Sequence, residues 1–327
     1  MKIIIAGGTG QVGTFLASAF HHLQHEVVIL SRSARSDPWK TVVWSNYPTD
    51  AWADEINGAD VVINLAGKSV NCRYNKENRR QIIESRTKTT TAIGQAIQKA
   101  TKPPKFWLNA GTATIYSHRY DAPNDEFTGL LGDEGNFPDS WKFSIDVAEQ
   151  WEAAVNQFEL ASTRTVIARM GMVMGSGKES VFDVLVGLAK KGLGGTLGNG
   201  KQYMSWIHEL DFLRAVQWLI ESENLSGPIN FCAPQPIPNR EFMKVVRDTI
   251  GVSIGLPAAN WMLEIGCFFL RTETELLLKS RRVIPGKLEK DGFKFLYPNW
   301  TDAAEEIRQR HEKNIGFQPE MLDRSIT

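Results

Sequence analysis

The sequence predicts an α/β fold built on a doubly wound parallel sheet, and three observations carry this prediction. The chain opens with a β-branched run at residues 3–5, which enters a glycine-rich turn and then a segment of helical period. Apolar runs of strand length follow at residues 26–30, 60–65, 105–110 and 165–170. Helical stretches separate several of these runs. Strands and helices that alternate along a chain build parallel sheets with helices on both faces.

The opening segment MKIIIAGGTGQVG places Gly7, Gly10 and Gly13 three residues apart, between a strand and a helix. In such a turn the first glycine permits the tight bend, the second lets backbone amides approach a pyrophosphate, and the third lets the helix pack closely on the strand. Glycine triplets also occur in ordinary loops, but here the flanking strand and helix complete a dinucleotide cradle of the Rossmann type. We expect the phosphates at the helix N-terminus, among Gly7, Thr9, Gly10, Gln11, Val12 and Gly13.

The end of the second strand indicates which dinucleotide binds. An NAD site usually has an Asp or Glu about 20 residues after the glycines, where it accepts a hydrogen bond from the ribose 2′-hydroxyl. Here the strand runs into Ser31, Arg32 and Arg35 instead. No carboxylate repels a 2′-phosphate there, and the Arg32 guanidinium can pair with one bidentately. We therefore expect NADP(H); the alternative is that both arginines are solvated loop charges.

Composition excludes several other classes of protein. With 327 residues and 42% hydrophobic content the chain can bury a large core. Its 37 basic and 37 acidic side chains balance, which disfavours a nucleic-acid groove or an anionic membrane surface. An apolar segment at residues 261–270 is interrupted by Glu264 and is too short to span a bilayer. We expect neither nucleic acid nor a membrane as a partner.

Cysteine content and the start of the chain bear on the compartment. Cys72, Cys232 and Cys267 are widely spaced and odd in number, which favours reduced thiols over disulfides or a metal site. The chain begins directly with the expected cofactor strand, which leaves no room for a signal peptide. Both features predict a cytoplasmic protein.

The buried run at residues 60–65 ends in a turn that we assign to the cofactor site, at Leu65, Ala66 and Gly67. At the carboxyl end of a parallel strand, Ala66 and Gly67 leave space for the ribose and the pyrophosphate. A charged helical stretch follows at about residues 75–99. It contains Arg79, Arg80, Arg86 and Lys88, and we expect most of its charge on a solvated face.

Residues 105–112 and 165–171 predict two more strands, with a helix at about residues 144–158 between them. We place Asn109 and Arg169, on these strands, among the cofactor-binding residues. For Arg169, binding an anionic group and pairing with a buried acid are equally open. Residues 171–200 then hold nine of the 27 glycines, so the loop-rich region 171–207 is expected to lie over a ligand on the substrate side.

The pattern changes again near residue 234, where helical segments and prolines replace the strand–helix alternation. We divide the chain into a nucleotide-binding domain at residues 1–233, a small mainly helical C-terminal subdomain at 234–302 and a charged tail at 303–327. The tail is expected to form an exposed helix or to fray.

These segments together resemble the extended short-chain dehydrogenase/reductase superfamily, the proteins related to NAD-dependent epimerases and dehydratases. Within it, the chain resembles the branch called epimerase family proteins. The resemblance runs through GGTGQVG, VVINLAGKSV and RMGMVMG to PGKLEKDGFKF, and is most specific in GLGGTLGNGKQYMSWIHELD at residues 192–211. It implies a nicotinamide cofactor and a separate C-terminal domain whose role is not established.

One departure from the wider superfamily bears on the reaction. Its members use a Tyr and a Lys four residues later, so that the cation lowers the pKa of the phenol and binds the nicotinamide ribose. This sequence has no such pair, and Phe143 and Val147 stand at the two positions. An unassisted phenol has a pKa near 10, so ionising it at pH 7 costs about 4 kcal/mol. The departure argues against alcohol oxidation by the usual route.

Three residues are candidates for catalysis. Thr112 corresponds to the superfamily's Ser or Thr after the fifth strand, or is a simple turn hydroxyl. Tyr116 acts as a neutral acid, or is structural with its hydroxyl at the surface. His208 can exchange a proton near cellular pH, or it bonds a backbone carbonyl or Asp211. The other histidines show no metal-ligand arrangement, so no metal is expected.

The sequence thus predicts an NADP(H)-binding oxidoreductase, a reductase or a nucleotide-sugar-epimerase-like protein, that acts on an unknown small polar substrate. The alternative is a catalytically idle NADPH sensor or partner-docking protein, for which the absent Tyr-Lys pair is the best argument. An open cavity beside the nicotinamide, expected at residues 192–211, distinguishes the two. A homodimer is compatible with the sequence, which does not fix the oligomeric state.

Overall fold

The computed structural model describes residues 1–44, 51–132, 137–177, 180–259, 262–263 and 273–322. Its centre is a seven-stranded sheet in the order β10-β6-β5-β4-β1-β2-β3, in which all neighbours are parallel. The predicted doubly wound sheet is therefore confirmed. The strand order reverses beside β1, which is where ligands bind in such sheets. The strands are β1 (Lys2–Ala6), β2 (Glu26–Ser31), β3 (Lys40–Val43), β4 (Val61–Asn64), β5 (Phe106–Thr112), β6 (Arg164–Met170) and β10 (Gly227–Phe231).

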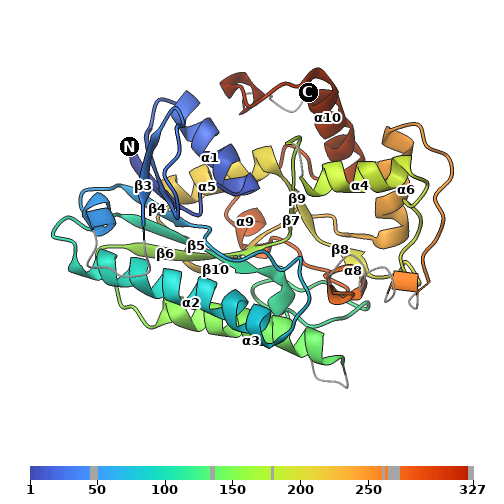
Figure 1. Ribbon diagram of the computed structural model, residues 1–327, viewed down its shortest axis with the longest axis horizontal. Helices are drawn as coiled ribbons and strands as arrows, with labels where there is room; N and C mark the ends of the chain where they lie inside the picture. Colours follow the sequence, from blue (N-terminus) through green and yellow to red (C-terminus); the bar gives the residue numbers. More distant parts are fainter. Residues whose placement is uncertain (45–50, 133–136, 178–179, 260–261, 264–272, 323–327) are drawn as a thin grey trace.

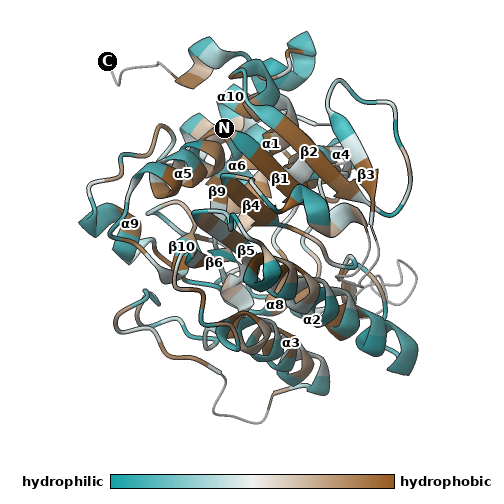
Figure 2. Cartoon of the chain, turned by 90° about the vertical axis from the view of Figure 1, so that its left-hand side faces the viewer, coloured by the Kyte–Doolittle hydropathy of each residue, from teal (hydrophilic) through white to brown (hydrophobic). Residues whose placement is uncertain are grey.

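Helices cover both faces of this sheet (Figure 1). Helices α1 (Gln11–His22) and α5 (Glu209–Glu221) lie on one face, and α2 (Lys76–Lys99) and α3 (Asp139–Asn156) lie on the other. Successive strand residues alternate between two buried clusters, so that Ile3 and Ile5 pack toward α1 while Ile4 packs toward α2. Because both faces are covered, the strands are continuous apolar runs, drawn brown in Figure 2.

Shorter elements follow the main alternation. Strand β7 pairs in parallel with β9, and β8 pairs antiparallel with β11. Helices α4, α6 and α10 gather beyond one end of the sheet, on the right of Figure 1. The bounds are β7 (Met172–Met174), β8 (Tyr203–Met204), β9 (Trp206–His208), β11 (Ile237–Pro238), α4 (Val181–Lys190), α6 (Asn239–Thr249), α8 (Glu275–Leu278), α9 (Gly286–Lys290) and α10 (Trp300–Lys313), with 3-10 turns η1 (Ala51–Glu55), η2 (Ala113–Ile115) and η3 (Pro319–Leu322).

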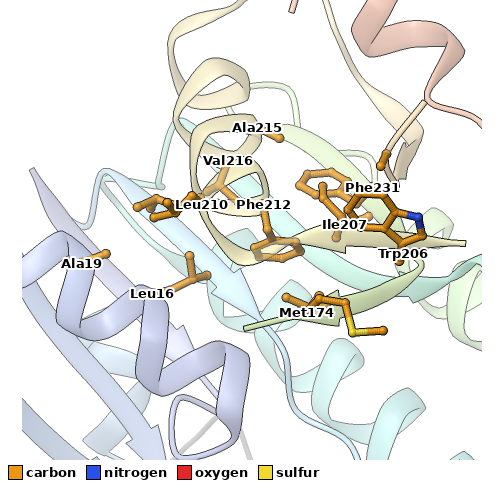
Figure 3. Close-up of a cluster of buried hydrophobic side chains, with 14 of the residues drawn as sticks. Leu16, Ala19, Met174, Trp206, Ile207, Leu210, Phe212, Ala215, Val216 and Phe231 are labelled. Atoms are coloured by element: carbon orange, nitrogen blue, oxygen red, sulfur yellow. The ribbon is translucent and has the colours of Figure 1, made fainter. Parts of the chain in front are cut away.

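One hydrophobic cluster joins the sheet to the C-terminal helices. Part of it appears in Figure 3, where Leu16 of α1 lies near Phe212 of α5 and Trp206 of β9 continues the cluster. The same cluster includes Phe242 of α6 and Trp300 of α10. The C-terminal region therefore shares its core with the nucleotide-binding sheet.

The tail expected from residue 303 onward is not an exposed helix. Helix α10 begins at Trp300, whose ring stacks on Phe242 with centroids 4.3 Å apart. Ala303, Ala304 and Ile307 are fully buried beneath the charged outer face. Their spacing repeats at three and four residues, the signature of an amphipathic helix, which the high density of Glu, Arg and Lys obscured in the sequence.

Among the described residues, no helix is long and apolar enough to cross a membrane. Cys72 and Cys232 are free thiols. Cys267 and most of the apolar segment 261–270 lie outside the described residues, as do residues 323–327 of the expected tail.

Candidate cofactor and substrate site

The turn between β1 and α1 needs glycine for packing at three positions. Gly7 has φ of +75°, and a Cβ added there would lie 2.7 Å from the amide nitrogen of Ala66. A Cβ at Gly13 would lie 2.5 Å from the Cα of Gly8. Gly8 was not singled out from the sequence. It leaves space for Ile29, because a Cβ added at Gly8 would lie 2.2 Å from Cδ1 of Ile29. The turn is thus held tightly against β2 and β4.

Gly10 differs, because its Cα faces open space. An added Cβ there would meet nothing closer than the carbonyl oxygen of Gly7 at 3.7 Å. Gly10 is the N-cap of α1, with no side-chain cap and no acidic residue in the first turn. First-turn amides of a helix lack intrahelical acceptors and attract anions. The cradle therefore fits a dinucleotide pyrophosphate, with exposed Thr9 beside Gly10 and with the amides of Gln11, Val12 and Gly13.

At the end of β2 the two predicted arginines differ. Ser31 is buried, and its Oγ accepts a hydrogen bond from the Ser33 amide at 3.3 Å. Arg35 pairs with Asp37 through Nε at 3.3 Å. Arg32 is exposed and forms no ion pair in the described part of the chain. Arg32 is therefore the guanidinium available to a 2′-phosphate.

A cavity of about 370 Å³ opens where β4, β5 and β6 end, between α2 and α3. It adjoins the cradle, because Gly7 packs against Ala66, whose neighbours on both sides line the cavity. Ala66 itself is buried, with its N–H donating to Asn64 Oδ1 at 3.1 Å. The strand ends and turns that form the floor are Leu65, Gly67, Ala110, Gly111, Thr112, Met170 and Gly171.

Thr112 is the one predicted catalytic residue that the structure brings to the cavity. Its Oγ1 accepts a hydrogen bond from the Thr114 amide at 3.1 Å, which caps the short helical turn after β5. The hydroxyl proton is not used in that bond. Thr112 can therefore donate to an oxygen of a ligand while it caps the turn.

Phe143 and Val147 of α3 also line the cavity. These are the two positions at which the wider superfamily has its Tyr and Lys, so the corresponding wall is apolar here. Tyr74 approaches the same wall from the segment before α2, and its ring lies 4.9 Å from that of Phe143, centroid to centroid. A phenol is thus present in the cavity, although it comes from another element.

Tyr116 does not line the cavity, contrary to the prediction that it acts on a substrate. It is buried, and its hydroxyl donates to Asn230 Oδ1 at 3.0 Å and accepts from Arg169 Nη1 at 2.9 Å. Burial raises the pKa of Tyr116 to about 12. The alternative prediction of a hydroxyl at the surface is also wrong, because both sides of that oxygen are satisfied inside the protein.

Arg169 forms a buried ion pair, so its assignment to the cofactor is wrong. Nε and Nη2 bind the two carboxylate oxygens of Glu152 on α3 at 2.7 and 2.8 Å. The third nitrogen holds Tyr116. All three nitrogens are therefore engaged inside the protein, and the alternative of a buried acid partner is confirmed.

Asn109 is likewise corrected from a cofactor ligand to an interior residue. Its Oδ1 accepts from Asn64 Nδ2 at 2.7 Å and from Thr90 Oγ1 at 3.1 Å. Trp151 Nε1 donates in turn to Thr90 Oγ1 at 3.1 Å. This network ties the ends of β4 and β5 to α2 and α3 and leaves Asn109 no exposed surface.

His208 lies away from the cavity, and the structure contradicts its prediction as a proton donor to a substrate. It is fully buried, and Nδ1 accepts from the Leu210 amide at 3.1 Å as the N-cap of α5. Nε2 therefore carries the proton and donates to Glu306 Oε2 at 2.8 Å. The ring also packs on Tyr297, with centroids 4.2 Å apart. His208 joins α5 to α10.

The glycine-rich segment 192–211 does not cover the cavity either, since none of its residues is among the lining. Its glycines permit backbone packing against residues 255–258. A Cβ at Gly195 would lie 2.2 Å from the carbonyl oxygen of Leu256, and the Leu256 amide donates to Gly192 O at 2.8 Å. Of the predicted loop region 171–207, the lining of the cavity includes Gly171, the first residue of that region.

Three charged residues to which the sequence analysis gave no role also line the cavity, namely Lys68, Arg86 and Glu275. Arg86 belongs to α2, whose charge was mostly expected on a solvated face, but its guanidinium carbon lies 4.9 Å from the Trp151 ring centroid. Its position four residues after the buried Ile82 on the same helix was the available signal. Glu275 of α8 is buried, accepts from Arg281 Nη2 at 2.5 Å and receives a hydrogen bond from Ser144 Oγ at 3.2 Å.

Comparison with known proteins agrees with this arrangement. The model of the NAD-dependent epimerase/dehydratase family matches residues 3–231. This chain belongs to that family. A second model, for a domain of unknown function (DUF1731), matches residues 258–307, the region that supplies Glu275 to the cavity. The resemblance stated from the sequence is confirmed, including the separate C-terminal domain.

Individual relatives are similar over almost the whole chain. The epimerase family protein SA0724 of Staphylococcus aureus (strain N315) is 31% identical over 308 residues, which are 94% of this chain and 98% of that protein. The epimerase family protein YfhF of Bacillus subtilis (strain 168) is 29% identical over 309 residues, again 94% of this chain and 98% of that protein.

Solved structures show the same fold. The crystal structure of the human epimerase family protein SDR39U1 (isoform 2) with NADPH matches with a TM-score of 0.82 and 28% identity, over 94% of this chain and 99% of that one. A nucleoside-diphosphate sugar epimerase from Corynebacterium glutamicum matches with a TM-score of 0.72 and 25% identity, over 99% of this chain and 63% of that one.

Proposed function

We propose that this protein is an NADP(H)-dependent reductase of small carbonyl compounds. The observation that carries the proposal is the cavity of about 370 Å³ beside the dinucleotide cradle, which has polar and charged groups in its wall. Cofactor binding alone does not require the hydroxyls of Thr112 and Tyr74 in that wall. The similar human protein crystallised with NADPH supports the choice of cofactor.

The residues of the cradle account for cofactor binding and selectivity. Bound NADP(H) would supply a hydride from its nicotinamide ring. The open N-terminus of α1 at Gly10 suits the pyrophosphate. Arg32 suits the 2′-phosphate, because it is exposed and Arg35 is paired with Asp37.

The residues of the cavity account for the substrate side. Thr112 can donate its hydroxyl proton in a hydrogen bond to a carbonyl oxygen, because Oγ1 already accepts from the Thr114 amide. Burial and the neighbouring Glu275 carboxylate raise the pKa of Tyr74 to about 12. A neutral phenol is an acid, so Tyr74 gives its proton to the substrate oxygen as the carbonyl carbon is reduced, and water restores that proton. Proton donation by a neutral phenol suits the reduction of a carbonyl group, which takes up a proton at its oxygen.

The test is a turnover screen with a chemical readout. The protein is incubated with NADPH deuterated at the transferable position of C4 and with a panel of small aldehydes, ketones and oxo acids. Deuterium in an alcohol product, detected by mass spectrometry, is the expected result. Tight NADPH binding without transfer to any compound of the panel would favour the sensor hypothesis.

A further inference from the structure

Arg86 is a half-buried cation that lacks an anionic partner among the described residues. In the described part of the chain it forms no ion pair, and its hydrogen-bond acceptor there is the carbonyl oxygen of Ile82 on its own helix, 3.0 Å from Nη1. Arg169, Arg281 and Arg310, in contrast, each pair with a buried glutamate. Burial lowers the pKa of Arg86 to about 10, so the guanidinium stays charged at neutral pH.

The surroundings hold this guanidinium at the edge of the cavity. It lies over the Trp151 ring, with Cζ 4.9 Å from the centroid. A Cβ added at Gly67 would lie 3.3 Å from the same Cζ, so glycine at that position leaves the guanidinium its space. A cation that is partly removed from water without an anion is costly, and such a group in a cavity wall is a candidate for binding an anionic ligand.

We propose that Arg86 binds the carboxylate of the substrate, so that the reductase acts on small oxo acids. A guanidinium has five N–H donors in a planar fork that matches a carboxylate bidentately. One nitrogen of Arg86 bonds Ile82, and Arg86 itself lines the cavity. The neutral phenol of Tyr74 lines the same cavity and reaches the rest of such a substrate.

The cavity wall favours a monocarboxylate over a phosphate group. Phe143, Val147 and Leu276 give it an apolar side that suits a short carbon chain. The charge of Glu275 is offset by Arg281, and Lys68 adds a cation to the wall, so the apolar side carries this preference. The cofactor phosphates have a separate place at the N-terminus of α1. A small organic acid is therefore the anion that this wall accommodates.

This inference rests on the proposed function for its substrate class, but binding tests it without turnover. Acetate, butyrate, benzoate and 2-oxobutyrate, each with its neutral amide, and inorganic phosphate are titrated into the NADPH-saturated protein by calorimetry. We expect at least one carboxylate to bind tenfold or more tightly than its amide and than phosphate. Arg86→Gln should weaken that carboxylate at least tenfold and leave NADPH affinity within about twofold.

The matched control is Arg80→Gln, on the same helix, because Arg80 pairs with Glu77 and Glu84 outside the cavity. It should leave carboxylate affinity unchanged. Thermal unfolding of each variant checks the fold, and Arg86→Lys should restore part of the affinity through its charge.

Three results would overturn the proposal. The first is that each carboxylate and its amide bind equally at concentrations up to 50 mM. The second is that Arg86→Gln leaves carboxylate affinity unchanged. The third is a tenfold loss of NADPH affinity in Arg86→Gln, which would assign Arg86 to the cofactor. Should the unmodified protein fail to bind NADPH, the proposed function fails, and the same titrations on the protein alone still decide the role of Arg86.

Discussion

Tyr74 and Phe143 pack edge to face, with ring centroids 4.9 Å apart and ring planes at 66°. Phe143 lies on α3 at the position where the wider superfamily has its tyrosine, and Tyr74 comes from the segment that precedes α2. The phenol therefore enters the same cavity from the segment before α2 and not from α3. Its pKa is raised and not lowered, because burial and Glu275 outweigh the hydrogen bond with Ser144 and the charge of Arg281.

Tyr74→Phe should lower the turnover number of carbonyl reduction by about 100-fold or more, the usual contribution of a general acid. Tyr116→Phe is the matched control, since its hydroxyl bonds Asn230 and Arg169 away from the cavity. It should keep full turnover and lose about 1–3 kcal/mol of unfolding free energy. Steady-state kinetics and denaturant unfolding measure the two effects. Normal turnover in Tyr74→Phe would remove the phenol from the mechanism.

The pH dependence of reduction follows from the same residue. Because the pKa of Tyr74 is raised to about 12, the phenol stays protonated throughout the neutral and mildly alkaline range. The rate of the chemical step should therefore stay flat up to about pH 9–10. A rate that falls above about pH 6.5–7 would instead indicate a histidine acid.

Arg32→Ala should weaken NADPH binding at least tenfold and leave NADH almost unchanged. The lost contact is a charged bidentate pair to the 2′-phosphate, worth about 1.5–3 kcal/mol. Arg35→Ala serves as the control, because Arg35 already pairs with Asp37. Fluorescence titration with both cofactors measures the difference. Equal affinities of the unmodified protein for NADPH and NADH would refute the assignment.

Gly10→Val and Gly13→Val should separate binding from folding. The Gly10 side chain would enter the open space in front of the helix N-terminus, so the protein should fold and lose dinucleotide binding. The Gly13 side chain would collide with Gly8, 2.5 Å from its added Cβ, so that variant should lose stability as well. Calorimetric titration and thermal unfolding distinguish the two. Retained binding in Gly10→Val would place the pyrophosphate elsewhere.

His208→Ala should act on stability and not on cofactor affinity. It removes the N-cap bond to the Leu210 amide and the bond to Glu306, together worth about 1–3 kcal/mol. His208→Asn should recover about 1 kcal/mol, because asparagine also caps helices. Chemical denaturation measures both variants, with NADPH affinity as the unaffected quantity. A selective loss of turnover in a fully stable His208→Ala protein would contradict the structural role.

The fold could be predicted from the sequence because its signals are local. The glycine turn, the β-branched run of β1 and the strand–helix alternation each lie within a few tens of residues. The same holds for Leu65, Gly67 and Thr112, since strand ends of a parallel sheet meet at one edge. Helix α10 was misjudged because its charged residues outnumber the four apolar ones at helical spacing.

The wrong site assignments depend on partners far away in the chain. His208 is satisfied by Glu306, 98 residues later, and Tyr116 by Asn230, 114 residues later. No local pattern distinguishes such a buried residue from a catalytic one. Arg86 was missed although a local signal existed, because the many charges of the helix outweighed its position four residues after the apolar Ile82.

The proposed function requires that the reaction takes place in the cavity between Thr112 and Tyr74. A crystal structure of the protein with NADPH would show where the nicotinamide ring lies. We predict that the nicotinamide ring enters this cavity, with C4 facing the space that Thr112 Oγ1 and the Tyr74 hydroxyl border. A nicotinamide ring outside the cavity, or a cavity that closes completely when NADPH binds, would contradict the account.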